Sequence, residues 1–342
     1  MNVSLSVVVP VYNASRWLQV SLDSLVGQRF GESVEIIIVD DGSTDQSINI
    51  IEKAKKRHSA LKLLRNERNL GIVASLNRAL DAAEGRFIAR MDADDICMPT
   101  RFYRQLRFIR ESGVDLCGSW FVEFGNGIPR AVRWPHSEAG LRTSMLFQNS
   151  ICHPAVMARR DVFDRYRYRE AYRLAEDYDL FTRAMADFRI ANVPEVLLRY
   201  RRHPNQATQA QRAPMESVTQ RIRLDTLAAE GINATGEEQR LHNLIRAPHS
   251  ITCVDDLLGI EAWLIKLAAL HETPEAKHVI SSQWIRACIR AAPLGSRMLR
   301  IYRTSALRGG MRTLMDLSAL AAMKLDYRSK PFAVLRRLGL SA

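Results

Sequence analysis

Residues 86–95 read RFIARMDADD, a short apolar run followed by three carboxylates at Asp92, Asp94 and Asp95. The run predicts a buried strand, and no other part of the sequence concentrates acid so strongly. Crowded carboxylates repel one another unless a cation neutralises them, and hard ions such as Mg²⁺ or Mn²⁺ prefer oxygen ligands. The stretch therefore predicts a strand that ends at a divalent-metal site. The alternative is a polar loop whose aspartates cap a helix beginning near Pro99 and Thr100.

Three strand–helix units precede this stretch. Apolar, β-branched runs predict buried strands at 4–11, 35–40 and 61–64. Apolar residues at helical spacing predict helices at 14–26, 44–57 and 69–83. We expect Ser43 or Thr44 to cap the second helix. Strands that alternate with helices in this way predict a parallel α/β sheet with right-handed crossovers.

Polar side chains follow all four predicted strands. They are Tyr12 and Asn13, Asp40 and Asp41, Arg65 and Asn66, and Asp92 and Asp94. In parallel sheets ligands bind at the carboxyl ends of the strands, so we expect these four loops to converge on one nucleotide-binding crevice. The chain has no G-x-G-x-x-G after its first strand, which argues against a dinucleotide site, and no P-loop. The charge of a diphosphate must then be met by metal-binding carboxylates.

The following region predicts further strands and a second acidic site. We expect strands, mixed or at a sheet edge, at 114–122, 128–132 and 152–157, and a helix at 137–146. Glu176 and Asp177 stand at the start of a helix that is expected to run through Met185. Acid at a helix N-terminus complements the helix dipole, and it is also a suitable position for a catalytic base.

The basic charge of the chain is concentrated near its end. Residues 277–342 hold 13 Lys or Arg against 2 Asp or Glu, whereas the preceding 276 residues hold 36 against 35. The pattern from 215 to 335 is mostly helical, and basic amphipathic helices favour an anionic membrane surface. The alternative is a solvated helical face. We expect no nucleic-acid partner, because no recognised binding motif accompanies the charge.

Cysteine usage and hydropathy predict the compartment. The five cysteines are scattered and form no C-x-x-C pair, which argues for reduced thiols in the cytosol. The sequence shows no secretory signal and no apolar run of the ~18 residues that a membrane span requires. A length of 342 residues suits about two domains. We therefore expect a cytoplasmic protein that lies peripherally on the inner face of the cell membrane.

Several motifs, taken together and in order, resemble the family 2 nucleotide-sugar glycosyltransferases with the GT-A fold. They are Pro10-Val11-Tyr12-Asn13, Val39–Asp45, Asn69-Leu70-Gly71 with Asn77, Ala89–Asp95, His153-Pro154 and Glu176-Asp177. The resemblance covers about residues 4–204. It implies a GT-A catalytic domain over 1–204, a doubly wound mixed sheet with a Rossmann-like nucleotide-binding half. A basic, mostly helical C-terminal region over 215–342 would follow it.

The resemblance implies roles for individual residues. The nucleotide sugar would be held by Pro10, Val11, Tyr12, Asn13, Asp41, Asn69, Gly71, Asn77, Arg90, Asp92 and Ala93. The metal ligands would be Asp94, Asp92 and His203, with Asp95 as a further candidate. Asp177 would be the base that takes the proton of the acceptor hydroxyl, with Glu176 and His153 near the acceptor. Ordinary turn, capping and structural roles remain the alternatives for these residues.

The activity that the resemblance implies is an inverting transfer with Mn²⁺ or Mg²⁺ as cofactor. The donor would be a nucleoside-diphosphate sugar, UDP-sugar first, with dTDP- and GDP-sugars open. A hexosyl or N-acetylhexosaminyl group would pass to a hydroxyl of a glycan or lipid-linked acceptor. The setting would be bacterial cell-surface polysaccharide synthesis, such as O-antigen, capsule or exopolysaccharide. The alternatives are a sugar nucleotidyltransferase, whose glycine- and lysine-rich fingerprint we do not find, and a catalytically silent scaffold subunit.

Overall fold

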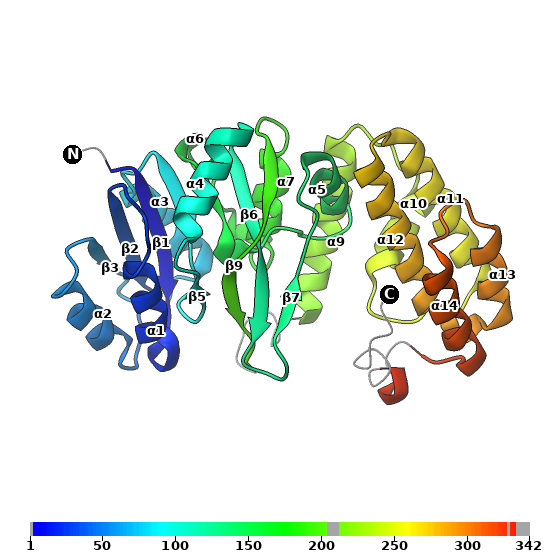
Figure 1. Cartoon of the computed structure of the whole chain (residues 1–342), viewed down its shortest axis with the longest axis horizontal. Coiled ribbons are helices and arrows are strands. Elements are labelled where there is room, and N and C mark those ends of the chain that lie inside the picture. Colours follow the sequence, from blue (N-terminus) through cyan, green and yellow to red (C-terminus); the bar gives the residue numbers. More distant parts are fainter. Residues whose placement is uncertain (1–2, 204–211, 327–328, 333–342) are drawn as a thin grey trace. The chain divides into compact units, whose positions relative to one another are not determined.

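The computed structural model describes residues 3–203, 212–326 and 329–332. The chain divides into two compact units (Figure 1). The first comprises Met1–Leu141 and Asn149–Ile222, and the second comprises Arg142–Gln148 and Arg223–Ala342. Residues 204–211, which contain most of the segment between the two predicted regions, lie outside the described residues, as do 333–342 at the end of the basic helical region.

A nine-stranded sheet forms the centre of the first unit, in the order β3-β2-β1-β4-β8-β6-β9-β5, with β7 paired to β6. Its first half contains β1 (Leu5–Val11), β2 (Val34–Asp40), β3 (Leu61–Arg65) and β4 (Phe87–Arg90). These four strands are parallel, as the sequence predicts. The connecting helices are α1 (Ser15–Val26), α2 (Ser47–Lys55) and α3 (Ile72–Ala82). Every residue of β1 is buried, because helices cover both faces of a sheet built from such crossovers.

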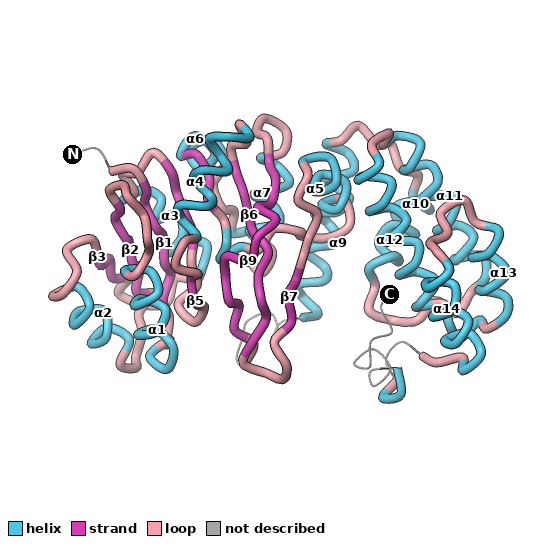
Figure 2. Tube along the Cα trace, viewed as in Figure 1, coloured by secondary structure: helices cyan, strands magenta, loops and turns pink. Residues whose placement is uncertain are grey.

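The other half of the sheet is mixed. Its strands are β5 (Ile96–Cys97), β6 (Leu116–Phe124), β7 (Arg130–Val132), β8 (Met157–Arg159) and β9 (Ile190–Arg201). The helices here are α4 (Arg101–Ser112), α5 (Glu138–Met145), α6 (Arg160–Arg165) and α7 (Glu176–Ala184). Strand β8 runs antiparallel to β4 and β6, whereas β6 and β9 are parallel. Figure 2 shows β6 and β9 side by side. The predicted fold class, a doubly wound mixed sheet, is confirmed.

Two local predictions are wrong. The strand expected at 152–157 begins only at Met157, and His153–Ala155 form a 3₁₀ turn instead. Pro154 has no N–H for a strand ladder and suits the first turn of a helical segment. Helix α2 begins at Ser47, whose N–H donates to Asp45 Oδ1, and neither Ser43 nor Thr44 caps it. Likewise, α4 has no side-chain cap, so the acidic run does not serve as the start of that helix.

Helices make up the second unit. Together with the residues leading into it they are α9 (Arg212–Ala229), α10 (Gly236–Arg246), α11 (Val254–Leu270), α12 (Pro274–Arg290), α13 (Ser296–Thr304) and α14 (Met311–Met323). Trp263 and Trp284 are fully buried in its core. His242 donates through Nε2 to the Leu146 carbonyl and accepts from Trp263 Nε1, and burial lowers its pKa to about 4. Among the helices that the structure describes, none has the length and apolar character needed to cross a bilayer.

Candidate active site

Asp41 fixes the loops at the carboxyl ends of β2 and β3. Its Oδ1 accepts hydrogen bonds from Asn66 Nδ2 at 2.6 Å and from the Leu70 N–H at 2.9 Å. Its Oδ2 accepts from the Gly71 N–H at 2.9 Å, at the start of α3. A carboxylate at a helix N-terminus satisfies N–H groups that have no partner inside the helix. The buried Asp41 therefore ties together the loops that follow β2 and β3 through three contacts with its own chain.

The residues expected to hold the nucleobase divide into a buried and an exposed set. Pro10 and Val11 are buried in β1. Tyr12 is 50% exposed just beyond that strand, and Asn13 adopts a positive φ of 48°. The Asn13 Oδ1 accepts from the Thr44 N–H, while the Asn13 N–H donates to Ser43 Oγ. Ser43 and Thr44 thus hold the loop that carries Tyr12 and Asn13 beyond the carboxyl end of β1.

Asp92, Asp94 and Asp95 form one acidic cluster. One oxygen from each carboxylate lies within 4.8 Å of the others. Asp95 is buried: its Oδ1 accepts from the Arg201 N–H at 2.7 Å, and its Oδ2 has no partner among the described residues. Burial, followed by the charges of Asp92 and Asp94, raises the pKa of Asp95 well above its usual value. His203 Nε2 lies 2.8 Å from Asp94 Oδ2, so the predicted ligands Asp92, Asp94 and His203 gather with Asp95.

This donor set fits Mn²⁺ or Mg²⁺. Carboxylate oxygens are the ligands that these hard cations prefer, and an imidazole nitrogen is compatible with Mn²⁺. A buried carboxylate oxygen without a hydrogen-bond donor, as at Asp95 Oδ2, costs free energy unless a cation or proton meets it. The cluster therefore has both the oxygen ligands and the unmet negative charge that a divalent ion requires.

Arg90 lies between the two acidic sites. Its Nη2 contacts Asp92 Oδ1 at 2.5 Å, while Nε and Nη1 are buried without an acceptor among the described residues. The side chain is almost completely buried, and its charge favours the ionised forms of both Asp92 and Asp177. Arg101, itself buried, donates to the Arg90 carbonyl at 2.9 Å and so fixes the end of β4. Two buried N–H groups without acceptors indicate a place for an anionic or hydroxyl-bearing ligand.

The second acidic site opens helix α7. Asp177 Oδ2 accepts from Asn149 Nδ2 at 2.7 Å, and its Oδ1 accepts from the Tyr178 N–H at 2.8 Å. Burial raises the pKa of Asp177 to about 6. Burial and the neighbouring Asp177 charge raise the pKa of Glu176 to about 7. Because the charge of Asp92 also raises the pKa of Asp177, the two acidic sites lie within electrostatic reach of one another.

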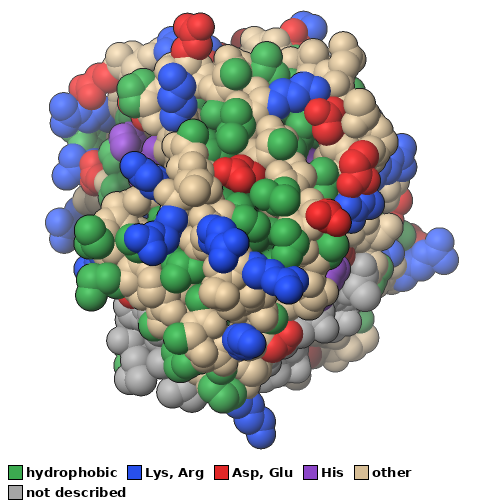
Figure 3. All heavy atoms as spheres, turned by 90° about the vertical axis from the view of Figure 1, so that its right-hand side faces the viewer, with side chains coloured by type: hydrophobic (Ala, Val, Ile, Leu, Met, Phe, Trp, Pro, Cys, Tyr) green, Lys and Arg blue, Asp and Glu red, His purple; other side chains and the backbone are tan. Residues whose placement is uncertain are grey.

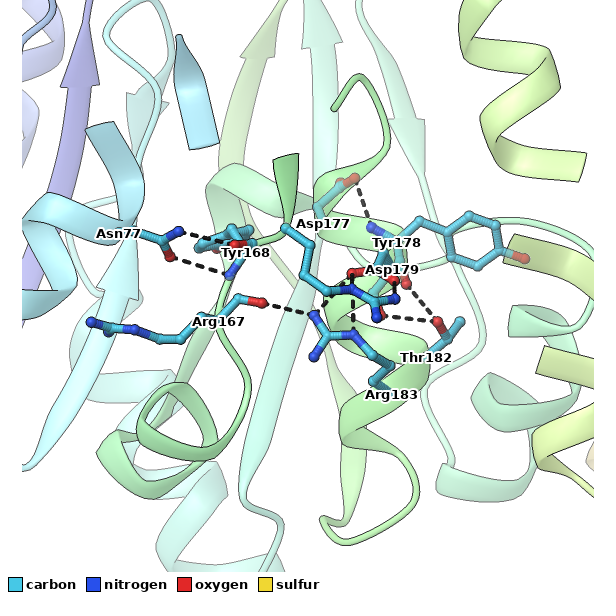
Figure 4. A network of polar contacts seen from close by, with 9 residues as sticks. Asn77, Arg167, Tyr168, Asp177, Tyr178, Asp179, Thr182 and Arg183 are labelled. Carbon is cyan, nitrogen blue, oxygen red and sulfur yellow. Dashed lines mark hydrogen bonds and ion pairs between the residues drawn. The ribbon is translucent and has the colours of Figure 1, made fainter. Parts of the chain in front are cut away.

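Two predicted site residues, Asn77 and His153, contact Tyr168 in ways that the sequence does not reveal. Asn77, expected to bind the nucleotide sugar, pairs its amide with the main chain of Tyr168, at 2.9 Å and 3.2 Å (Figure 4). His153 is 9% exposed, and its Nε2 lies 2.8 Å from the Tyr168 hydroxyl. Sequence reasoning missed Asn149 and Tyr168. Neither belongs to a periodic pattern, and only the folded chain shows that Asn149 contacts Asp177 and that Tyr168 contacts His153.

The remaining predicted residues, Asn69, Gly71 and Ala93, lie beyond the carboxyl ends of β3 and β4. Asn69 is exposed beside the contacts of Asp41, and Gly71 adopts a φ of 92° before α3. Ala93 is nearly buried between the aspartates of the cluster. The structure therefore brings the acidic cluster, Arg90 and the Asp177 site together, with Asn77 and His153 in supporting positions behind them.

Comparisons with known proteins place this chain in a family. The protein-family model for glycosyl transferase family 2 matches residues 6–167 of this chain. An uncharacterized glycosyltransferase of Haemophilus influenzae is 29% identical over 65% of this chain and 72% of its own length. The amylovoran biosynthesis glycosyltransferase AmsE of Erwinia amylovora is 31% identical over 57% of this chain and 75% of its own length.

Solved structures show the same fold. Staphylococcus aureus TarS 1–349 in complex with UDP-GlcNAc is 22% identical, with a TM-score of 0.56, covering 94% of this chain and 88% of that one. The Pyrobaculum calidifontis mannosyltransferase PcManGT in complex with GDP-Man and Mn²⁺ is 17% identical, with a TM-score of 0.52, covering 98% and 83%. These similarities support the GT-A fold, and the sequence matches show that the chain belongs to glycosyl transferase family 2.

Proposed function

We propose that this chain is an inverting glycosyltransferase that moves a sugar from a nucleoside-diphosphate sugar, UDP-sugar first, to a hydroxyl of a glycan or lipid-linked acceptor. The observation that carries the proposal is the pairing of two acidic sites, one at Asp92–Asp95 and one at Asp177, with the Arg90 guanidinium between them. The UDP-GlcNAc and GDP-Man complexes of the structural neighbours support a nucleotide-sugar donor. The names of the relatives AmsE, an amylovoran biosynthesis glycosyltransferase, and WbnJ, an O-antigen biosynthesis glycosyltransferase, support a role in polysaccharide synthesis. We propose a hexosyl or N-acetylhexosaminyl group as the sugar that is transferred.

We assign Asp94, Asp92 and His203 to hold Mn²⁺ or Mg²⁺, with Asp95 as a further ligand. When bound, such an ion neutralises negative charge on the departing diphosphate. Arg90 adds a fixed positive charge beside Asp92, and its two N–H groups without acceptors can donate to donor oxygens. We place the nucleoside among Tyr12, Asn13 and Asn69 at the mouth of the crevice.

Asp177 performs the proton transfer in this mechanism. Its carboxylate takes the proton of the acceptor hydroxyl as the acceptor oxygen bonds to the anomeric carbon. The bond from that carbon to the diphosphate oxygen breaks at the same time, and the electron pair leaves with the nucleoside diphosphate. Attack from the face opposite the leaving group inverts the anomeric configuration. Glu176 borders the acceptor side, and catalysis is assigned to residues 1–204.

Incubation with radiolabelled UDP-, dTDP- and GDP-sugars plus Mn²⁺ separates this proposal from its two rivals. Release of free sugar and nucleoside diphosphate, or transfer to an added glycan, supports the glycosyltransferase. Formation of sugar 1-phosphate and nucleoside triphosphate from added pyrophosphate supports a sugar nucleotidyltransferase. The absence of turnover with every donor supports a catalytically silent scaffold and contradicts the proposal.

We further propose that the helical region over 215–342 attaches the protein to the anionic inner face of the cell membrane, where a lipid-linked acceptor would lie. Arg297, Arg300 and Arg303 are exposed along α13, and Arg308 and Arg312 follow. Among the ion pairs of the described residues, none involves these five arginines.

Exposed methionines accompany this charge. Met311 and Met315 on α14 are 73% and 66% exposed, and Met323 is exposed at the end of the same helix. Figure 3 views the helical unit from the side of α13 and shows Lys and Arg side chains interspersed with hydrophobic ones. Cationic side chains beside exposed apolar ones match a bilayer surface, which offers anionic headgroups above an apolar layer.

A further inference from the structure

We propose that His153 and Tyr168 act as a pair of positioning residues that holds the Asp177 carboxylate ready to take the acceptor proton. This inference rests on the proposed role of Asp177 as the base. In this inference His153 acts on the Asp177 carboxylate, whereas the sequence suggested that His153 lies near the acceptor.

The pair lies in line with Asp177. His153 Nε2 is 2.8 Å from the Tyr168 hydroxyl, and His153 Nδ1 is 3.9 Å from Asp177 Oδ2. Phe181, one turn along the helix that Asp177 opens, packs edge-on against the imidazole with ring centroids 6.0 Å apart. Phe181 and Tyr168 thus flank the imidazole, whose two nitrogens face the Tyr168 hydroxyl and the Asp177 carboxylate.

The surroundings set the protonation of both members of the pair. Burial, and then the positive charge of Arg90, lowers the pKa of His153 well below its usual value, so the imidazole is neutral at physiological pH. Burial raises the pKa of the Tyr168 phenol, which therefore keeps its proton. A neutral imidazole has one N–H donor and one nitrogen acceptor. When Tyr168 donates to Nε2, the ring proton resides on Nδ1 and faces the Asp177 carboxylate.

The opposite tautomer is disfavoured because it would turn the Nδ1 lone pair toward a carboxylate. The Nδ1–H form instead directs a positive dipole end at Asp177 Oδ2, the oxygen that Asn149 also contacts. This arrangement directs the imidazole at Oδ2 and leaves Oδ1, which accepts from the Tyr178 N–H, as the oxygen that takes the acceptor proton. Arg90, Asp92 and Glu176 are the other charged groups that act on this acidic site.

Tyr168 is anchored by two helices. Asn77 of α3 holds its main chain at both the N–H and the carbonyl. The carbonyl of the preceding residue, Arg167, accepts from Arg183 Nη2 of α7 at 2.7 Å, and Arg183 also pairs with Asp179 on the same helix (Figure 4). The helix that carries Asp177 thus fixes the segment that presents Tyr168.

Nitrogen-15 NMR of the histidine-labelled full chain tests the geometry without any substrate. We assign the His153 signal as the one that His153→Phe removes. The proposal predicts a neutral ring between pH 5.5 and 8, with its proton on Nδ1. A signal with the proton on Nε2, or an imidazole that titrates near pH 6.5, would overturn it.

Kinetics then test whether the pair acts through Asp177. With the donor found in the screen and Mn²⁺, we expect Tyr168→Phe and His153→Phe to lower kcat on the order of tenfold with little change in donor KM. We also expect the acidic limb of kcat/KM to move to higher pH, because the ionised form of Asp177 loses support. Tyr166→Phe is the matched control. It removes a tyrosine hydroxyl in the same segment, one that donates to Asp187, and it should change neither kcat nor the pH of the acidic limb.

The outcomes distinguish this inference from the proposed function. Transfer by Asp177→Asn at near wild-type rates would remove the base assignment itself. An inactive Asp177→Asn together with unchanged kcat and pH profiles in Tyr168→Phe and His153→Phe would overturn the positioning pair alone. If His153→Phe fails to fold, Tyr168→Phe alone tests the positioning pair, because it removes a single oxygen atom and leaves the packing of the ring intact.

Discussion

Partial burial of Asp177 creates a conflict between its environment and its proposed task. A base must be ionised, yet burial favours the neutral carboxyl and raises its pKa to about 6. The Asn149 amide, the Tyr178 N–H and the charge of Arg90 all favour the ionised form and limit that rise. A base with a pKa near the working pH is effective because it is mostly ionised and still accepts a proton readily.

The pH profile of the enzyme follows from this pKa. Below pH 6 the Asp177 carboxyl is protonated and cannot take the acceptor proton, so we expect kcat/KM to rise with pH and to level off above about pH 7. The measurement is kcat/KM between pH 4.5 and 8 at saturating Mn²⁺, with circular dichroism to show that the chain stays folded. A flat profile across this range would contradict the assignment of a base with a raised pKa.

Sequence reasoning at the residue scale identifies the acidic residues but not their supports. Asp92, Asp94 and Asp177 lie in short motifs, so they could be named in advance, and the structure brings them into one region. Asn149 and the partners of Asn77 and His153 depend on the path of loops between elements. Such contacts leave no periodic signal in the sequence, because each involves segments far apart in the chain.

At the scale of elements, the parallel half of the sheet was predictable and the irregular half only in part. Runs such as 4–11 and 35–40 are mostly apolar, which is typical of strands buried on both faces. The segment at 152–157 is apolar as well, but Pro154 turns its first residues into a 3₁₀ turn. The start of α2 was misplaced because several polar residues in 43–46 could each cap a helix, and pairing with Asn13 withdraws Ser43 and Thr44.

Gly42, in the loop after β2, is required by both its backbone and its surroundings. Its φ is 71°, and a Cβ there would lie 2.7 Å from the carbonyl carbon of Arg68. Gly42→Ala should therefore lower the free energy of unfolding by about 2–4 kcal/mol, combining the cost of a left-handed alanine with that of a close contact.

Gly127→Ala is the matched control for this substitution. Gly127 also has a positive φ, of 86°, but a Cβ there meets nothing within 4 Å, so we expect a loss of about 1 kcal/mol. Urea denaturation of both variants gives the comparison. If Gly42→Ala and Gly127→Ala lowered the free energy of unfolding equally, the close approach of the Arg68 backbone to Gly42 would not constrain the loop.

At the scale of the whole molecule, the basic charge gathers in the helical region, and the sequence alone located it. The structure adds which arginines are exposed without an ion pair among the described residues and that exposed methionines accompany them. Sequence could not supply this distinction, because a helical charge run looks the same whether or not acidic side chains pair with it.

Flotation with vesicles containing anionic phospholipid tests the membrane proposal on the full chain. Replacing Arg297, Arg300 and Arg303 with Gln should lower vesicle binding on the order of a hundredfold, since each basic side chain near an anionic surface contributes about 1 kcal/mol. The matched control replaces Lys53, Lys56 and Arg57, three exposed cations at the end of α2, and should bind as the wild type does. Equal binding by all three proteins, or equal binding to neutral vesicles, would contradict the proposal.

The central claim is that the Asp94 site holds the donor while the Asp177 site activates the acceptor. Titration calorimetry with Mn²⁺ and the nucleoside diphosphate of the donor found in the screen, UDP first, tests it alongside sugar transfer in wild type, Asp94→Ala and Asp177→Asn. We predict that Asp177→Asn binds the nucleotide as tightly as wild type and loses transfer on the order of a thousandfold, whereas Asp94→Ala loses nucleotide binding. Unchanged binding by Asp94→Ala, or transfer by Asp177→Asn at near wild-type rates, would contradict the division of roles.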